Sequence, residues 1–242
     1  MREEREMPAA ANPQENTRRE IQKIIPSPGE RGLQKLLYRL GKYLPAKMTP
    51  NQMTAVGAFG GLFAVLSLLL ARVSMWFFAG AIAGVIVHIV ADDLDGYIAR
   101  TRNMSSKAGA YFDLITDVMF CTFFLIALPF SGYVHMQAVI LLVPGYAIII
   151  VTMMNYILHF GEFLFPLTGP FEVHITYILC AAGAMLFGKA PLLHLWGLGL
   201  TAVDILLLAA VVPVYFEMIR LQIQLFLRLK AQEADAAAGE EP

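Results

Sequence analysis

The stretch DDLDGYIARTRNMSSKAGAYFDLITD, residues 92–117, places carboxylates directly after one apolar segment and just inside the next. Asp92 and Asp95 are three residues apart, so on a helix they share a face. Asp113 and Asp117 are four residues apart and share a face of a second helix. The connection between the two helices is short, which predicts antiparallel neighbours. We therefore expect both acidic pairs to converge on one cavity at a similar depth.

The composition is that of a membrane protein. The chain is 57% hydrophobic and 15% charged, against about 45–50% and about 25% in soluble domains. Several apolar runs approach the roughly 20 residues that a spanning helix needs. They lie near residues 52–71, 75–91, 112–130, 134–158, 171–188 and 192–216. We expect an all-α integral membrane protein with six transmembrane helices.

The lysine and arginine residues predict the orientation. Ten of them precede the first span, three lie between the second and third spans, and three follow the sixth, whereas the alternate loops hold two. This bias puts both termini, and with them the acidic residues, in the cytoplasm. We expect no secretory signal peptide, because the first 47 residues are polar and lack its apolar region. No nucleic-acid partner is expected.

Three regions are expected along the chain. Residues 1–30 form a mobile tail, residues 31–230 the membrane domain, and residues 231–242 an acidic tail. At the start of the membrane domain, leucines recur at helical spacing with basic residues on the other faces, which predicts an amphipathic helix along the membrane surface. A solvated helix packed on cytoplasmic loops is the alternative.

Single residues inside the spans carry further expectations. Pro144 and Pro213 lie inside apolar runs and predict bends. Cys121 and Cys180 are expected to be packing residues. Asp204 lies in the outer half of the sixth span and is expected to pair with a polar group or to be protonated.

The four converging carboxylates need a positive partner. A carboxylate at the bilayer centre costs about 3 kcal/mol on insertion scales, and like charges repel. Hard oxygen ligands select Mg²⁺, Mn²⁺ or Ca²⁺. The small residues Gly96, Ala99 and Gly109 leave bare backbone for a nucleotide or diphosphate, and Arg100 and Lys107 add positive charge for its phosphates. Small-residue helix packing is the alternative, but it leaves the acids unexplained.

At these residues the chain resembles the CDP-alcohol phosphatidyltransferase family, whose signature is D-x2-D-G-x2-A-R-x8-G-x3-D-x3-D. All eight fixed positions match. The matching residues are Asp92, Asp95, Gly96, Ala99, Arg100, Gly109, Asp113 and Asp117. TPNQMT at residues 49–54 is similar to a P-N-x-x-T found in the family at the start of the first span. The resemblance covers roughly residues 31–230 and implies transfer of a substituted phosphate from a CDP-linked alcohol to a second alcohol, with release of CMP.

The resemblance also implies roles for individual residues. Asp92, Asp95 and Asp113 look like ligands of two divalent ions, Mg²⁺ or Mn²⁺, and Asp117 looks like the general base and a shared ligand. The nucleotide would lie against Gly96, Ala99 and Gly109, with Arg100 bracing it and Asn51 as a weaker candidate beside Thr54. A lipid substrate and homodimers are common in the family. Asp93 is off the acidic face by about 100 degrees. It is expected either to contact the metal ligands from behind or to face a loop.

The substrates are less defined. GPFE at residues 169–172 is similar to the G-P-T-E of choline and ethanolamine phosphotransferases, and Glu172 beside aromatic residues suits an ammonium group. A CDP-choline or CDP-ethanolamine donor with a diacylglycerol acceptor is therefore the first expectation. The alternative is a CDP-diacylglycerol donor with inositol phosphate, glycerol phosphate or another polyol as acceptor. Glu172 could equally be an acid favoured at a helix N-terminus, and Lys107 is a further substrate candidate.

His88 lies one turn deeper than Asp92 on the same face. It is a candidate for contact with the acceptor or with Asp92, and a histidine hydrogen-bonded within the bundle is the alternative.

Two other classes of protein compete. A divalent-cation transporter would use the four acids as an ion pathway but does not need Gly96, Ala99 and Arg100 at fixed offsets. An intramembrane prenyltransferase would also use aspartates and magnesium, but its motif calls for acids four residues apart in D-x3-D, and residue 96 is glycine.

Overall fold

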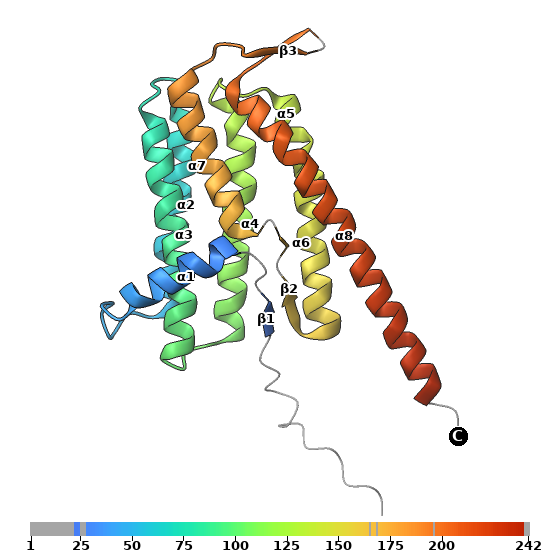
Figure 1. The fold of residues 1–242 in the computed structure, drawn as a ribbon. Helices are drawn as coiled ribbons and strands as arrows, with labels where there is room; N and C mark the ends of the chain where they lie inside the picture. Colours follow the sequence, from blue (N-terminus) through green and yellow to red (C-terminus); the bar gives the residue numbers. More distant parts are fainter. Residues whose placement is uncertain (1–21, 25–27, 165, 168, 196, 240–242) are drawn as a thin grey trace, which may run out of the picture.

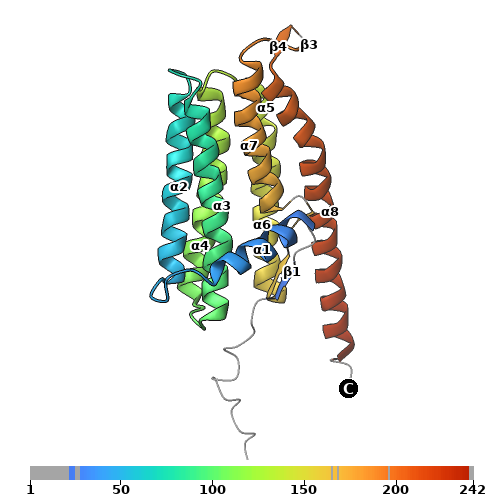
Figure 2. The same cartoon turned by 60° about the vertical axis from the view of Figure 1, so that its left-hand side comes forward.

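The computed structural model describes residues 22–24, 28–164, 166–167, 169–195 and 197–239, and these form a bundle of roughly parallel and antiparallel helices (Figures 1 and 2). The helices, in chain order, are α1 (Pro28–Gly41), α2 (Pro50–Leu70), α3 (Phe77–Thr101), α4 (Lys107–Phe130), α5 (Met136–Ile140), α6 (Leu142–Phe160), α7 (Pro170–Phe187) and α8 (Ala202–Gly239). Residues 1–21, 25–27 and 240–242, which include most of the expected N-terminal tail, lie outside the described residues.

Within the described part of the chain, six helical segments are long and apolar enough to cross a membrane, which confirms the expected number of spans. The sixth differs in its bounds. Residues 192–200, assigned to this span from the sequence, contain the antiparallel strands β3 (Leu193–Leu195) and β4 (Leu198–Leu200). Helix α8 begins after this hairpin and continues to Gly239, so most of the expected acidic tail extends the last helix.

Helices α2, α3 and α4 pack closely at one side of the bundle, and glycines make this possible. A Cβ atom at Gly84 of α3 would lie 2.5 Å from the carbonyl oxygen of Gly60 of α2, and one at Gly61 would lie 2.7 Å from the ring of Phe120 of α4. The backbones can approach because no side chain separates them. The acidic residues sit on this closely packed unit.

Helix α1 crosses the bundle near the end where α3 finishes and α4 begins (Figures 1 and 2). Leu37 of α1 is buried with Ala91, Leu94 and Ile98 of α3, whereas Leu36 and Leu40 are exposed. A Cβ atom at Gly41 would lie 2.5 Å from the ring of Tyr97, and one at Gly29 would lie 2.5 Å from the ring of Phe171, the second residue of α7. Helix α1 therefore packs against both α3 and α7. Its contact with a membrane surface stays a prediction.

The remaining features follow the expectations in part. The fourth span is split at Leu141 into α5 and α6, three residues before Pro144, because this proline supplies no amide donor to the turn before it. Helix α8 continues through Pro213.

Both cysteines are free and buried in the main apolar core, which confirms their packing role. Strand β1 (Gln22–Ile24) pairs in parallel with β2 (Glu162–Leu164), joining the segment before α1 to the α6–α7 connection.

Candidate active site

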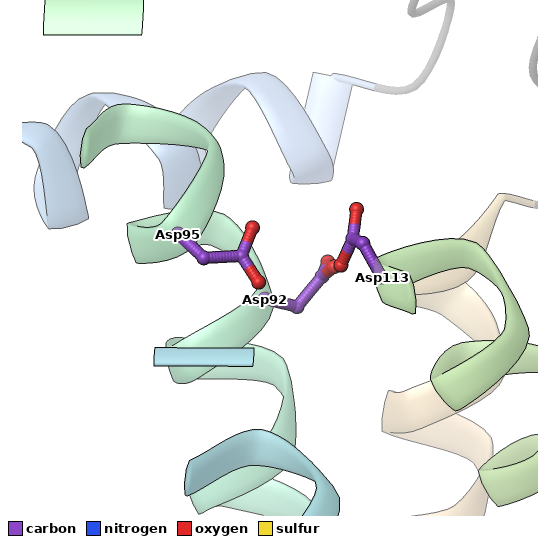
Figure 3. A group of neighbouring side chains, drawn as sticks. All are labelled: Asp92, Asp95 and Asp113. Atoms are coloured by element: carbon purple, nitrogen blue, oxygen red, sulfur yellow. The ribbon is translucent and has the colours of Figure 1, made fainter. Parts of the chain in front are cut away.

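Three of the four signature aspartates meet at one point. Asp92 and Asp95 project from α3, and Asp113 projects from the facing first turns of α4 (Figure 3). Each offers a carboxylate oxygen within 4.8 Å of the others. Ser106 caps α4, accepting a hydrogen bond from the Gly109 amide at 3.0 Å, and so defines the helical register that turns Asp113 toward α3. The convergence predicted from residue spacing is confirmed.

The arrangement fits a divalent cation. Mg²⁺ and Ca²⁺ bind oxygen at about 2.0 to 2.6 Å, so two ligands on opposite sides of one ion are about 4 to 5 Å apart. The 4.8 Å limit on the three oxygens lies in this range. The carboxylates are hard ligands, and those of Asp92 and Asp113 are partly exposed, which leaves room for water or phosphate oxygens.

Asp117 lies outside this group of three, but its side chain contacts that of Asp92. Its Oδ1 atom is 3.5 Å from Nε2 of His88, and its side chain is 30% exposed. His88 is buried, and its Nδ1 atom lies 3.0 Å from the carbonyl oxygen of Gly57, to which it donates. From the sequence, His88 was a candidate for contact with the acceptor or with Asp92, and the alternative was a histidine hydrogen-bonded within the bundle, which the bond to Gly57 confirms. The structure places it against Asp117 on the next helix.

Helix α2 supplies the third wall of the site. The Thr54 hydroxyl donates to Oδ2 of Asp95 at 2.6 Å, which orients this carboxylate toward the other acids. The start of α2 is a capping box, in which Thr49 accepts from the Gln52 amide at 3.3 Å and Gln52 accepts from the Thr49 amide at 3.0 Å. Thr49 is therefore the N-cap residue of α2. Asn51 instead faces α4, with its Oδ1 atom 3.0 Å from where a Gly109 Cβ would be.

A small pocket joins these elements, and its lining residues come from α2, α3 and α4. They are Thr54, Gly57, His88, Asp92, Asp95, Asp113, Thr116 and Asp117. All four signature acids thus line one space. Thr116 and Gly57 were not among the residues proposed from the sequence, because neither belongs to a charged pattern.

Arg100 contacts a residue that sequence spacing did not suggest. Its guanidinium donates to the Tyr38 hydroxyl of α1 and lies 5.5 Å from the centre of the Tyr38 ring. The same guanidinium lies over Gly96, at 3.0 Å from where a Cβ atom there would be. Helix α1 therefore reaches the surface at which the nucleotide was predicted to bind.

Arg102 holds the connection between α1 and α2. Its guanidinium donates to four carbonyl oxygens at 2.7 to 3.3 Å, those of Leu44, Pro45, Ala46 and Met48. This contact was not predicted, because Arg102 lies outside the signature. It ties the segment before α2 to the end of α3, and both helices contribute to the pocket.

Other candidates lie elsewhere. Glu172 is the N-terminal acid of α7, where its Oε2 atom accepts a hydrogen bond from the Gly169 amide at 2.8 Å. Of the two expectations for Glu172, its position therefore agrees with that of an acid at a helix N-terminus. Lys107 is the first residue of α4 and is exposed. Asp93 is buried, with 8% of its surface exposed, and its expected position, behind the metal ligands or facing a loop, stays a prediction.

Comparison with known proteins agrees with the signature. Residues 47–222 match the CDP-alcohol phosphatidyltransferase family. The chain is 30% identical over 150 residues to a protein of Archaeoglobus fulgidus named bifunctional IPC transferase and DIPP synthase, covering 60% of this chain and 27% of that protein. It is 33% identical over 85 residues to the Aquifex aeolicus protein of the same name, covering 34% of this chain and 18% of the relative. The aligned segments thus span about a quarter or less of these relatives. The match extends over most of the six-helix unit and includes every residue of the signature, and the chain belongs to the CDP-alcohol phosphatidyltransferase family.

Proposed function

We propose that the protein transfers a substituted phosphate group from a CDP-linked alcohol to a second alcohol, with release of CMP. The observation that carries this proposal is the convergence of the signature acids from α3 and α4 on one pocket. A cation transporter also needs acids within the membrane, but the family match and the complete signature favour the transferase.

The proposed metal ligands are Asp92, Asp95 and Asp113. Asp117 follows Asp113 by four residues, about one helical turn, and is proposed to share in binding a second ion. Mg²⁺ or Mn²⁺ bound there would neutralise the diphosphate and stabilise CMP as it leaves. Thr54 holds the Asp95 carboxylate in place through its 2.6 Å hydrogen bond. Such preorganisation matters because a ligand that must reorient on binding loses affinity.

Asp117 is the proposed general base. It lines the pocket with the other acids and its side chain is 30% exposed, so an acceptor hydroxyl can reach its carboxylate. The hydroxyl oxygen forms a bond to phosphorus, the bond from phosphorus to the CMP oxygen breaks, and the hydroxyl proton passes to Asp117. A positioned base of this kind is worth about 10² to 10⁴ in rate.

The nucleotide is proposed to bind on the outer side of the acids, along Gly96 and Ala99 of α3 and toward Gly109 of α4. Arg100 already lies over Gly96, and Asn51 lies beside Gly109. Arg100 can contact the donor's phosphate oxygens, since guanidinium binds phosphate well. Its contact with Tyr38 makes α1 part of the nucleotide site.

Two observations favour the polyol acceptor over the choline or ethanolamine type. Glu172, the proposed ammonium contact, is engaged as the helix cap of α7. The relatives of the chain are named for IPC transferase and DIPP synthase activities, and none of the three is named for choline or ethanolamine transfer. We therefore assign CDP-diacylglycerol as donor and a polyol or its phosphate as acceptor.

The positive-inside bias supports a site that opens to the cytoplasm, with both termini on that side. A homodimer is proposed from the family resemblance alone. Neither proposal affects the chemistry at the acids.

A panel of substrates tests the function. Purified protein with Mg²⁺ is given CDP-diacylglycerol with glycerol phosphate or inositol phosphate, and CDP-choline or CDP-ethanolamine with diacylglycerol, and released CMP is measured. We expect release with the first group. If none of these pairs releases CMP while the protein carries divalent cations across liposomes, the transporter assignment replaces this one.

A further inference from the structure

Two buried histidines stand side by side behind the acids. His88 of α3 and His174 of α7 have stacked rings, with centroids 5.3 Å apart and planes inclined by 25°. Phe120 of α4 contacts both rings, at centroid distances of 4.0 Å and 5.5 Å. The two histidines are 1% and 2% exposed. Their positions are therefore closely defined by packing from three helices.

The ring nitrogens have different surroundings. Nδ1 of His88 faces the carbonyl oxygen of Gly57 at 3.0 Å, and Nδ1 of His174 faces that of Pro170 at 2.6 Å. A carbonyl oxygen only accepts, so each Nδ1 carries the proton and donates. In the neutral ring each Nε2 is then a hydrogen-bond acceptor.

Neither Nε2 atom has a hydrogen-bond partner among the described residues. Such buried polar atoms are uncommon, and each calls for an explanation. Of the two histidines, His88 lines the pocket with the signature acids, and its Nε2 atom lies 3.5 Å from Oδ1 of Asp117. The Asp117 carboxylate also contacts Asp92, whereas Nε2 of His88 lacks a hydrogen-bond donor among the described residues, and a ligand hydroxyl in this pocket would supply one.

We propose that Nε2 of His88 accepts a hydrogen bond from a hydroxyl group that neighbours the attacking hydroxyl of the acceptor, so that the acceptor is a vicinal diol. The proposal rests on the proposed function and names the acceptor class for the same site. Asp117 takes the proton of the attacking hydroxyl, and the neighbouring hydroxyl keeps its proton and donates it to His88. The two hydroxyls of a vicinal diol are joined through two carbon atoms, which suits two acceptor atoms 3.5 Å apart.

Other acceptors fit this pair of atoms less well. Diacylglycerol has one free hydroxyl, which Asp117 would engage, and would leave the buried Nε2 of His88 without a donor. Leaving a buried acceptor unpaired is costly, and a site that binds a hydroxyl discriminates against analogues that lack it.

The test compares two acceptors that differ by one hydroxyl. The full chain, with Mg²⁺ and CDP-diacylglycerol, is given glycerol phosphate or 3-hydroxypropyl phosphate, which lacks the neighbouring hydroxyl, and kcat/KM is obtained from CMP release. Wild type should prefer glycerol phosphate by about tenfold or more, as expected for one hydrogen bond in a buried site. His88→Phe, which keeps a ring for stacking, should bring the ratio of kcat/KM between the two acceptors close to one.

His174→Phe is the matched control. It alters the same ring stack, but His174 is not among the lining residues of the pocket, so the ratio between the two acceptors should stay that of wild type. Thermal unfolding shows whether each variant is folded. If His88→Phe does not fold, the wild-type ratio still decides, because equal efficiency with the two acceptors overturns the proposal.

The remaining outcomes separate this proposal from the function on which it rests. Equal losses with both acceptors in folded His88→Phe mean that His88 has only a structural role, and the proposal is wrong. CMP release from CDP-choline with diacylglycerol but not with glycerol phosphate or inositol phosphate also overturns it, while the transferase function stands. Failure of every donor and acceptor pair overturns the transferase function itself.

Discussion

Buried or half-buried carboxylates occur at both ends of the bundle, and their surroundings differ. At the end where α8 begins, Asp204 is fully buried and accepts four hydrogen bonds of 2.7 to 2.9 Å. The donors are the amide and Nδ1 of His135 and the amide and hydroxyl of Thr201. At the other end, Asp92, Asp95 and Asp113 point at one another, and Asp117 contacts Asp92 and lies 3.5 Å from Nε2 of His88.

The difference separates a structural acid from functional ones. A carboxylate surrounded by protein donors is stabilised by the fold and has little capacity left for a ligand. Carboxylates that face each other repel and are stabilised by a cation. The expectation that Asp204 pairs with a polar group is confirmed, and its partners link α8 to the start of α5.

The largest effect is expected from the base. Asp117→Asn removes the group that takes the hydroxyl proton and should lower kcat for CMP release by about 10² to 10⁴. Binding of the nucleotide and of Mn²⁺ at Asp92, Asp95 and Asp113, measured by calorimetry, should be largely preserved, whereas Asp95→Asn should weaken both. Equal turnover in wild type and Asp117→Asn would remove the base assignment.

A change at the opposite end should affect stability and leave chemistry intact. Asp204→Ala leaves the buried donors of Thr201 and His135 without their acceptor, which should cost about 3 kcal/mol in the free energy of unfolding. Thermal unfolding in detergent measures the loss, and Asp235→Ala, at an exposed acid of α8, is the control. A large fall in kcat/KM of folded Asp204→Ala at permissive temperature would contradict the separation of the two ends.

Arg102 tests whether the connection before α2 supports the acidic end. Arg102→Met keeps the length of the side chain but removes its hydrogen bonds to four carbonyl oxygens. We expect a loss of about 1 to 2 kcal/mol in stability and a higher KM for the CDP-linked donor. The exposed Arg72, in the connection between α2 and α3, offers Arg72→Met as a control. A donor KM that matches the control would show that this connection does not support the site.

The smallest effect is expected from Tyr38→Phe. This change keeps the ring that packs on Tyr97, with centroids 5.1 Å apart, but removes the hydroxyl that contacts Arg100. One exposed hydrogen bond is worth about 0.5 to 1.5 kcal/mol, so KM for the CDP-linked donor should change a few-fold while kcat is retained. Tyr43→Phe, at a fully exposed position, is the control. Identical kinetics in the two variants would separate α1 from the nucleotide site.

Much of the fold was predictable from local patterns. Apolar length predicted the six spans, and the spacing of Asp92, Asp95 and Asp113 predicted their convergence, because helical geometry relates near neighbours in the chain. The hairpin at residues 193–200 was missed, since its leucines continue the apolar composition of the span that follows. The break at Leu141 agreed with the expectation from Pro144.

The contacts that complete the site were less predictable. His88 reaches Asp117, Thr54 reaches Asp95, and Tyr38 reaches Arg100, over separations of 29, 41 and 62 residues. No period in the sequence relates residues so far apart. The role of Glu172 was also ambiguous, because an acid at that position suits either a ligand or a helix cap, and only the hydrogen bond to Gly169 distinguishes them.

The sequence by itself determined the membrane class, the family signature and the two helices that carry the acids, since these depend on composition and on periodicity within one or two turns. Tertiary structure alone decided which three acids form the closest group, which histidine Asp117 faces, and how α1 and α2 close the site. Those features depend on how separate helices pack, and glycines such as Gly60 and Gly84 permit the close approach. The physical reason is that side-chain partners across helices are selected by shape and distance in the folded bundle.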